Sequence, residues 1–207
     1  MSIILVGLNH KSSPLEIREK VSLSRNQIFQ ISKKLKSARS IFGSAILSTC
    51  NRTEFYLNVG SAVLGLNEAI EIISNKSGIL VDELESYLYV KKNKDAVQHL
   101  FFVAAGLDSM ILGESQIQGQ VQDAYEIALD AEISDSIINT LFMNALTVGK
   151  RVRTETQIDR ESVSISSAAV SLAKRFYNGL EDKVVLVLGA GETSELTTRH
   201  LISNGIK

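Results

Sequence analysis

The stretch Ser44-Ala45-Ile46-Leu47-Ser48-Thr49-Cys50-Asn51-Arg52-Thr53-Glu54-Phe55-Tyr56-Leu57-Asn58-Val59 contains the only cysteine of the 207-residue chain. Its apolar run before the cysteine and its alternating residues after it predict two strands, 44–48 and 53–59. Cys50 therefore lies in a short connection between strands, two residues before Arg52. The nearby cation favours a reactive thiolate, whereas a free cysteine is more often a small buried hydrophobe. From these residues alone, both interpretations stay open.

Composition and charge limit the classes of protein that fit. Hydrophobic residues make up 44% of the chain, and 22 basic residues nearly balance 23 acidic ones, as in an ordinary soluble globular protein. With a net charge of -1, any nucleic acid would have to be held by a local basic patch. A lone cysteine cannot form an internal disulfide, which predicts a reducing, cytoplasmic location. The sequence shows no signal peptide and no apolar run near the ~20 residues that span a bilayer.

The first hundred residues alternate between strand and helix patterns. Continuous apolar residues predict a central strand at 3–8, and helical spacing predicts helices over 15–22, 28–35 and 66–73, the last stopped near Gly78. A short strand is expected at 87–90, followed by a helix that Asn93 caps and that ends at Gly106. This order predicts a compact α+β domain with an antiparallel or mixed sheet and helices on one face.

Two capping boxes predict where helices begin. Ser13 precedes Pro14 and stands three residues before Glu16, and Ser24 stands three residues before Gln27. In a capping box the serine and the third side chain satisfy N–H groups that the first helical turn leaves free. We therefore expect helices to begin directly after both serines.

The second half of the chain begins with helical patterns. Apolar stripes over 117–128 and 138–152 predict two helices that pack together and cover the first domain. Residues 162–166 alternate like a strand, but the apolar spacing from 165 to 176 favours a long helix with Gly179 as its C-cap.

A glycine turn near the C-terminus has the pattern of a dinucleotide-binding unit. Residues 184–188 predict a buried parallel strand that leads into Gly189-Ala190-Gly191-Glu192-Thr193-Ser194 and then a helix to residue 204. The N–H groups at such a helix start favour a pyrophosphate. One half-unit does not bind a dinucleotide, because the residue that reads the ribose normally lies ~20 residues further on.

Three further features are ambiguous by themselves. His99 stands among apolar residues and reads as a core side chain or as a base. The segment 106–120 reads as a helix–turn–helix corner or as the lining of a polar pocket. The basic cluster 150–156 reads as a solvated helix end or as a phosphate contact. No spacing of histidine, cysteine or carboxylate residues suggests a metal site.

Four segments taken together resemble the glutamyl-tRNA reductase family, in family order and spacing across essentially the whole chain. They are Ser48-Thr49-Cys50-Asn51-Arg52-Thr53-Glu54, Gly106-Leu107-Asp108-Ser109 through Gly119-Gln120, Gly149-Lys150-Arg151-Val152-Arg153-Thr154-Glu155-Thr156, and Gly189-Ala190-Gly191-Glu192-Thr193. His10-Lys11 and Arg18-Glu19 also fit, whereas Ser115 replaces an expected proline. The resemblance implies that NADPH reduces glutamyl-tRNA to glutamate-1-semialdehyde, at the entry to 5-aminolevulinate and tetrapyrrole (porphyrin) biosynthesis.

The resemblance also implies roles for single residues. Cys50 matches the family's nucleophile, which forms a thioester, and His99 matches a histidine that assists proton transfer or positions the ester. Substrate binding is implied for Thr49, Asn51, Arg52, Ser109, Glu114, Ser115, Gln116 and Gln120. NADPH binding is implied for Gly189, Ala190, Gly191, Glu192, Thr193 and Ser194, and no metal is expected.

The family architecture implies a ferredoxin-like-type catalytic domain at 1–158, a connecting helix at 159–180 and an incomplete Rossmann NADP-binding domain at 181–207. We therefore expect a partial chain of a longer reductase, a homodimer when complete, with glutamate-1-semialdehyde aminotransferase as a further partner. Two other interpretations remain. One is a non-catalytic tRNA-binding or regulatory module, and the other is a generic NAD-dependent dehydrogenase with an incidental cysteine.

Overall fold

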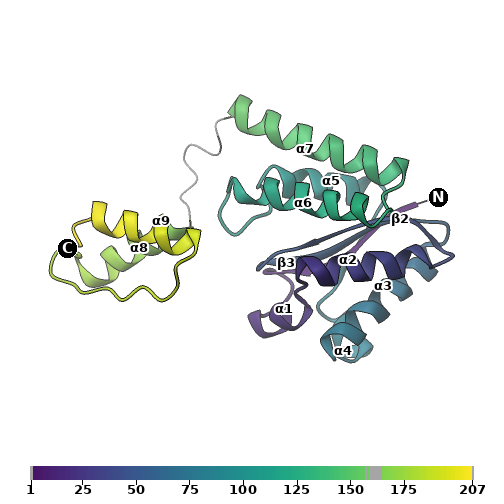
Figure 1. The fold of residues 1–207 in the computed structure, drawn as a ribbon, viewed down its shortest axis with the longest axis horizontal. Helices are drawn as coiled ribbons and strands as arrows, with labels where there is room; N and C mark the ends of the chain where they lie inside the picture. The colour runs from purple at the N-terminus through teal and green to yellow at the C-terminus, as the bar shows by residue number, and fades with distance from the viewer. Residues whose placement is uncertain (1, 157, 159–164, 207) are drawn as a thin grey trace. The chain divides into compact units, whose positions relative to one another are not determined.

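The computed structural model describes residues 2–156, 158 and 165–206. The chain divides into two compact units, residues 1–157 and 158–207. The elements of the first unit are, in chain order, β1 (Ser2–Asn9), α1 (Leu15–Val21), α2 (Arg25–Lys36), β2 (Ile41–Ser48), β3 (Arg52–Val59), α3 (Ala62–Ser77), α4 (Val81–Glu85), β4 (Tyr89–Lys92), α5 (Lys94–Ala104), α6 (Gln116–Asp130) and α7 (Ser136–Thr156) (Figure 1).

The four strands of this unit form one antiparallel sheet in the order β2-β3-β1-β4. The predicted strands on both sides of Cys50 and the predicted central strand are confirmed, each slightly longer than expected. The short strand predicted at 87–90 begins two residues later. The sheet places the connection between β2 and β3, which contains Cys50, at the end where Asn9 of β1 pairs with Arg52 of β3.

Helices cover both faces of the sheet, so the expectation of helices on one face is wrong. Every residue of β3 is buried, although successive side chains point to opposite faces. On one face, the Tyr56 ring packs edge-on against Phe142 of α7 at 5.5 Å between ring centroids. On the other face, Gly65 of α3 lies so close that an added Cβ would stand 2.5 Å from a methyl group of Val59. Glu54 and Tyr56, which share the face opposite to Phe55 and Leu57, are completely buried.

The two predicted capping boxes have different outcomes. The one at Ser24 is confirmed, because its Oγ accepts from Gln27 N and Gln27 Oε1 accepts from Ser24 N. The one at Ser13 is wrong, since Pro14 is the N-cap residue of α1 and makes no side-chain cap. Ser13 Oγ instead donates to the carbonyl oxygen of Asn9 at 3.0 Å. The hydroxyl therefore ties the end of β1 to the start of α1.

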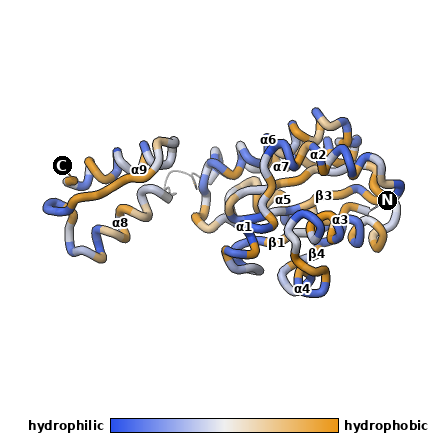
Figure 2. The backbone as a smooth tube through the Cα atoms, turned by 60° about the horizontal axis from the view of Figure 1, so that its bottom comes forward, coloured by the Kyte–Doolittle hydropathy of each residue, from blue (hydrophilic) through white to orange (hydrophobic). Residues whose placement is uncertain are grey.

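One continuous hydrophobic core fills the first unit and includes all its large fully buried side chains. Figure 2 shows the hydrophobic stretches along the strands, with polar residues concentrated on the helices around them. Helices α2 and α6 pack against each other and against the edge strand β2, and α5 packs against α6 and α7. Within the described ranges, no helix is long and apolar enough to cross a bilayer.

The second unit contains α8 (Ile165–Tyr177) and α9 (Glu192–Ser203), which pack through a small core of Val170, Leu180 and Leu201. The helix predicted from residue 165 is present as α8 and the one predicted to end at residue 204 is present as α9, and residues 159–164 of the expected connecting helix lie outside the described residues. The predicted strand 184–188 is not formed, and Val184 is 99% exposed. A strand needs a partner for its N–H and C=O groups, and no described residue pairs with this segment.

Candidate active site

Thr49, the residue before Cys50, holds the turn that contains Cys50. Thr49 N donates to the carbonyl oxygen of Arg52 at 2.8 Å. Thr49 Oγ1 accepts from the backbone N–H groups of Asn51 and Arg52 at 3.1 and 3.2 Å. These three bonds fix the backbone between β2 and β3, while the Cys50 side chain is exposed. The interpretation of Cys50 as a small buried hydrophobe is therefore wrong.

Two neighbouring segments hold the same turn from outside. Arg18 of α1 donates from Nη1 to the Cys50 carbonyl oxygen at 3.2 Å and to Asn51 Oδ1 at 3.0 Å. His10 N donates to the Asn51 carbonyl oxygen at 2.9 Å. Asn51, which was expected to bind substrate, thus anchors the turn. The sequence contained Arg18 as part of the family pattern but gave no sign of this contact.

A buried charge cluster lies behind the turn and consists of Arg52, Glu54, Tyr56, Tyr89 and His99. Glu54 is completely buried. Its Oε1 accepts from Arg52 Nη1 at 2.8 Å, lies 2.8 Å from His99 Nε2 and accepts from the Tyr89 hydroxyl. Its Oε2 accepts from the Tyr56 hydroxyl at 2.6 Å. The cluster joins β3, β4 and α5 around one carboxylate.

The cluster keeps Glu54 ionised. Burial alone would raise the pKa of its carboxyl, but the Arg52 charge and the hydrogen bonds from His99 and Tyr56 lower that pKa to about 2. Burial and the Glu54 charge raise the pKa of both Tyr56 and Tyr89, so both hydroxyls remain donors. Glu54 was quoted in the sequence motif without a role, because its partners come from distant segments.

Arg52 lies in a different environment from the one expected of a substrate-binding residue. Its side chain is 2% exposed. Besides Glu54, it contacts Asp108, to whose Oδ2 it donates from Nη1 at 3.1 Å and to whose backbone oxygen it donates from Nη2 at 2.6 Å. Burial alone would lower the pKa of Arg52, but Glu54, the two tyrosines and Asp108 raise it overall. Arg52 is therefore a permanent cation that the protein's own groups surround.

The loop from Gly106 to Gly113 brings Asp108 to Arg52. Both glycines have positive φ, +77° and +79°, which glycine adopts without steric cost. Gly113 N donates to Gly106 O at 2.9 Å and closes the loop. At its tip, Asp108 also accepts from Lys11 Nζ at 2.5 Å. Burial alone would raise the pKa of Asp108, but Lys11 and Arg52 lower it. The reading of this segment as a simple helix–turn–helix corner is therefore incomplete.

Arg153 of α7 holds the base of the same loop. Its guanidinium donates to the Ala104 oxygen at 3.1 Å, to the Gly149 oxygen at 3.0 Å and to the Glu114 oxygen at 3.3 Å. It also donates to Gln118 Oε1. Two alternatives were open for the basic cluster 150–156, a solvated helix end and a phosphate contact, and Arg153 fits neither. Arg151 fits the solvated alternative, because it forms an exposed ion pair with Glu155.

The other expected substrate residues lie in two places. Ser109 follows Asp108, is half-buried, and its Oγ is buried without a hydrogen-bond partner among the described residues. Gln120 lines a cavity of about 160 Å³ together with Ser48, two residues before Cys50. Glu114 is half-buried, whereas Ser115 and Gln116 are exposed at the start of α6. The structure therefore brings Ser109 to Arg52 and Gln120 to the end of β2.

The expected cofactor turn belongs to the second unit. Gly189 has a φ of +113°, and Gly191 is the N-cap residue of α9. Nothing lies within 4 Å of a Cβ built on Gly191, which leaves room for a phosphate to approach the helix start. Thr193 contributes its carbonyl oxygen to hydrogen bonds from Ser166 and Thr197. The predicted turn and helix are therefore present, although the expected strand before them is not formed.

Fold and site together define an α+β domain that presents an exposed thiol beside a buried charge cluster. The chain matches the family model described as "Glutamyl-tRNAGlu reductase, N-terminal domain" over residues 6–156. The chain belongs to this family, and the resemblance seen in its sequence is confirmed.

Individual relatives agree with this assignment. The chain is 52% identical over 206 residues to a glutamyl-tRNA reductase of Pelotomaculum thermopropionicum and 50% identical over 207 residues to one of Carboxydothermus hydrogenoformans. In both cases all of this chain and 46% of the relative are covered. The solved structure of glutamyl-tRNA reductase from Methanopyrus kandleri has 36% identity and a TM-score of 0.66, covering 99% of this chain and 47% of that one. The chain spans about half the length of the curated relatives it matches.

Proposed function

We propose that this chain forms the acyl-transfer part of an NADPH-dependent glutamyl-tRNA reductase, at the first committed step of 5-aminolevulinate and tetrapyrrole biosynthesis. The observation that carries the proposal is the exposed Cys50 thiol, whose turn is fixed by Thr49 and Arg18. Relatives of that name, identical at half of the aligned positions, support it. Thiolates are strong nucleophiles toward activated carbonyl carbons.

In the proposed reaction, Cys50 receives the glutamyl group. Its thiolate Sγ attacks the carbonyl carbon of the ester, and a carbon–sulfur bond forms while the carbon–oxygen bond to the tRNA ribose breaks. The ribose oxygen leaves as an alkoxide and takes up a proton from solvent, and the glutamyl group remains on Cys50 as a thioester. The fixed turn favours this step because the nucleophile's backbone needs no reorganisation.

Arg52 and its loop partners supply the polar surroundings of the glutamyl group. Asp108 Oδ2 reaches Arg52 Nη1 at 3.1 Å, and the Asp108 side chain is 18% exposed. Asp108 thus shows that a carboxylate can reach Arg52 from the solvent side. We propose that the carboxylate of the substrate competes with Asp108 for Arg52. The buried Ser109 Oγ and His10 Nδ1 have no hydrogen-bond partner among the described residues. Because buried polar atoms are normally paired, these two atoms fit a bound polar ligand.

His99 and the remaining residues take supporting roles in this proposal. His99 Nε2 faces Glu54 at 2.8 Å, so the geometry supports positioning of Arg52 through Glu54 rather than direct proton transfer from that nitrogen. Thr49 orients the turn, and Glu114 supplies a carboxylate for the α-amino group. Gln116 and Gln120 lie on α6, where Gln120 borders the cavity next to Ser48.

The cofactor turn of the second unit would supply the pyrophosphate-binding part of an NADPH site. The residues Gly189 to Ser194 would receive its pyrophosphate at the start of α9, where free N–H groups carry positive partial charge. NADPH, when bound, supplies the hydride that converts the acyl group to an aldehyde. The turn leaves space for the phosphates at Gly191, because nothing lies within 4 Å of the position that a Cβ atom would take there.

The finer architecture belongs to the same proposal. A strand–helix–strand–strand–helix–strand succession with the order β2-β3-β1-β4 supports a ferredoxin-like-type domain at 1–158. A connecting helix at 159–180 and a Rossmann domain that begins at 181 would follow. A homodimer and the aminotransferase as a partner remain predictions from the family resemblance, and a cytoplasmic location remains a prediction from the lone cysteine.

Mass spectrometry of Cys50 after incubation with glutamyl-tRNA, without NADPH, tests the proposal. We expect a glutamyl adduct on Cys50 that is absent from a Cys50→Ser variant. An unmodified thiol, together with intact tRNA binding, would indicate a non-catalytic binding or regulatory module. Reductase activity that survives Cys50→Ser in a complete relative would instead indicate a dehydrogenase with an incidental cysteine.

A further inference from the structure

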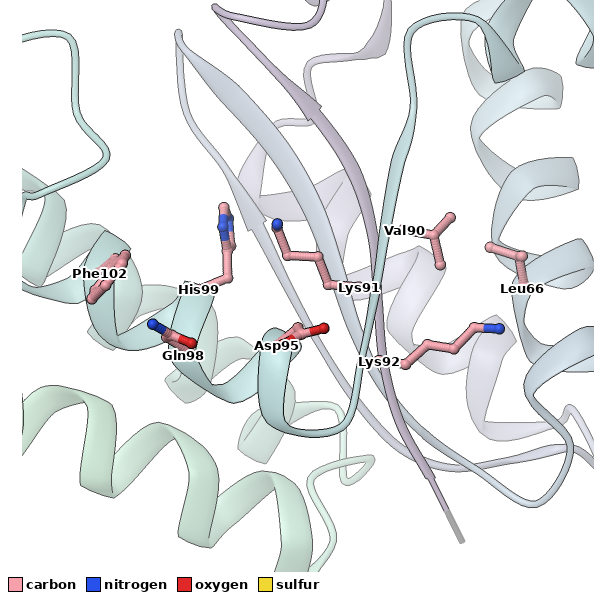
Figure 3. A pocket seen from close by; sticks show the side chains of 8 residues that line it. All are labelled: Leu66, Val90, Lys91, Lys92, Asp95, Gln98, His99 and Phe102. Carbon is pink, nitrogen blue, oxygen red and sulfur yellow. The ribbon is translucent and has the colours of Figure 1, made fainter.

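A cleft of about 760 Å³ runs beside the edge strand β4. Its lining residues are Leu66, Val90, Lys91, Lys92, Asp95, Gln98, His99 and Phe102. Figure 3 shows Lys91 and His99 on one side of β4, and Val90 and Leu66 on the other. Among the described residues, no strand pairs with the outer edge of β4. The cleft therefore opens around a free sheet edge.

One end of the cleft adjoins the buried charge cluster. In the sheet, Gly7 pairs with both Glu54 and Tyr89, whereas Ile4 pairs with Leu57 and Lys92. The Tyr89 end of β4 therefore lies nearest the Cys50 turn, and Lys92 lies at the far end of the strand. His99 belongs to both regions, because it lines the cleft and its Nε2 contacts Glu54. The cleft thus leads away from the site along β4.

The lining of the cleft combines cations, an amide and an aromatic ring. Lys91 and Lys92 outnumber its one carboxylate, Asp95. No ion pair found in the described ranges involves either lysine. The Phe102 side chain is 46% exposed, so its ring is accessible from the cleft. Single-stranded nucleic acids bind where cations meet phosphates and aromatic rings stack on bases.

We propose that this cleft binds the last nucleotides at the 3′ end of the aminoacyl-tRNA. Phe102, near the charge cluster, would stack on a base, and Lys91 and Lys92 would contact phosphates further from the ester. The inference rests on the proposed function, since the ester must reach Cys50 while the RNA chain that carries the ester continues away from the site. It also supplies the local basic patch that a chain of net charge -1 needs for binding nucleic acid.

Equilibrium binding to a glutamate-specific tRNA transcript tests the cleft independently of thiol chemistry. In a Cys50→Ser background, we expect Lys91→Ala/Lys92→Ala to lower the slope of log affinity against log salt concentration by about 1 to 2. The matched control Lys33→Ala/Lys34→Ala removes two exposed lysines of α2, beside the opposite edge strand, and should leave the slope unchanged. Equal slopes for all three proteins, or no binding by the parent, would overturn the proposal.

A second variant locates the contact at the 3′ end. We expect Phe102→Leu to weaken binding of the intact transcript on the order of tenfold, and to have no effect on a transcript without its terminal nucleotides. An equal effect on both transcripts would place the contact elsewhere on the tRNA and contradict the proposal. If Lys91 and Lys92 only protect the free edge of β4 from pairing with other strands, the Lys91→Ala/Lys92→Ala variant will bind the tRNA as the parent does, like the Lys33→Ala/Lys34→Ala control. Absence of a glutamyl adduct on Cys50 in the unaltered chain would instead count against the proposed function.

Discussion

Replacement of Glu54 by glutamine removes the central charge of the buried charge cluster and nearly preserves the shape of the side chain. A glutamine resembles a carboxyl group that is permanently protonated. The surroundings lower the pKa of Glu54 from 4.5 to about 2, which corresponds to about 3 kcal/mol in favour of the ionised form. We therefore expect Glu54→Gln to lower the free energy of unfolding at pH 7 by about 3 kcal/mol.

The same shift fixes the direction of the pH dependence. Between pH 4.5 and about 2, the unfolded chain binds a proton at Glu54 that the folded chain does not bind. The contribution of Glu54 to stability is therefore fully present above pH 4.5 and is lost as the pH falls toward 2. In the unaltered chain the free energy of unfolding should fall through this window, and in Glu54→Gln this part of the fall should be absent.

Urea unfolding followed by near-ultraviolet circular dichroism measures both effects. The chain has no tryptophan, and four of its five tyrosines, Tyr56, Tyr87, Tyr89 and Tyr125, lie in the first unit. Glu132→Gln is the matched control, because Glu132 is an exposed partner of Lys36 and exposed pairs contribute little to stability. The reasoning would be refuted if Glu54→Gln lowered the free energy of unfolding at pH 7 by less than about 1 kcal/mol. It would also be refuted if the free energy of unfolding depended on pH in the same way in the unaltered chain and in Glu54→Gln.

Three further substitutions, one of them a control, test the packing and the hydrogen bonds around the site loop. An added Cβ on Gly149 would stand 2.7 Å from the Ala104 oxygen, so Gly149→Ala should lower the free energy of unfolding by about 1–3 kcal/mol. Gly119→Ala, with nothing within 4 Å of its Cβ position, should instead raise it by about 0.5–1 kcal/mol. Urea titrations that rank these variants in the opposite order would contradict the packing described. Arg153→Lys removes the fork that binds Ala104 and Glu114 and should cost about 1–2 kcal/mol. It should also slow acylation of Cys50, and an unchanged acylation rate would show that the loop does not depend on Arg153.

Local sequence patterns predicted those features that depend only on interactions between residues close together in the chain. The Ser24 capping box is an interaction between residues three positions apart, and it formed as expected. The Ser13 box failed because α1 begins one residue later than expected: Pro14 is the N-cap residue, and Ser13 lies before it, where its hydroxyl donates to Asn9 of β1. The strand expected at 184–188 failed for a related reason, since its hydrogen bonds depend on a partner strand that the segment's own residues do not provide.

The site was predictable in part. The position of Cys50 in a short connection between two strands was predicted correctly, whereas its exposure was left open by the sequence and is shown by the structure. The charge cluster was not predictable, because Glu54 meets His99 across 45 positions and Arg52 meets Asp108 across 56. The cleft beside β4 was not predicted either, although most of its lining lies within residues 90–102, because it depends on how α5 packs beside β4 and on the pairing of β4 with β1.

The separation of these contacts along the chain has a consequence for folding. The β2–β3 hairpin that carries Cys50 closes between neighbouring segments, whereas the contacts of Arg52, Glu54 and Arg153 close loops of 35 to 56 positions. Distant contacts form against a larger loss of chain entropy. The nucleophile's turn can therefore exist early on the folding pathway, before Asp108 has reached Arg52 and before His99 has reached Glu54. A chain released at that stage would expose a reactive thiol without the surroundings that direct it.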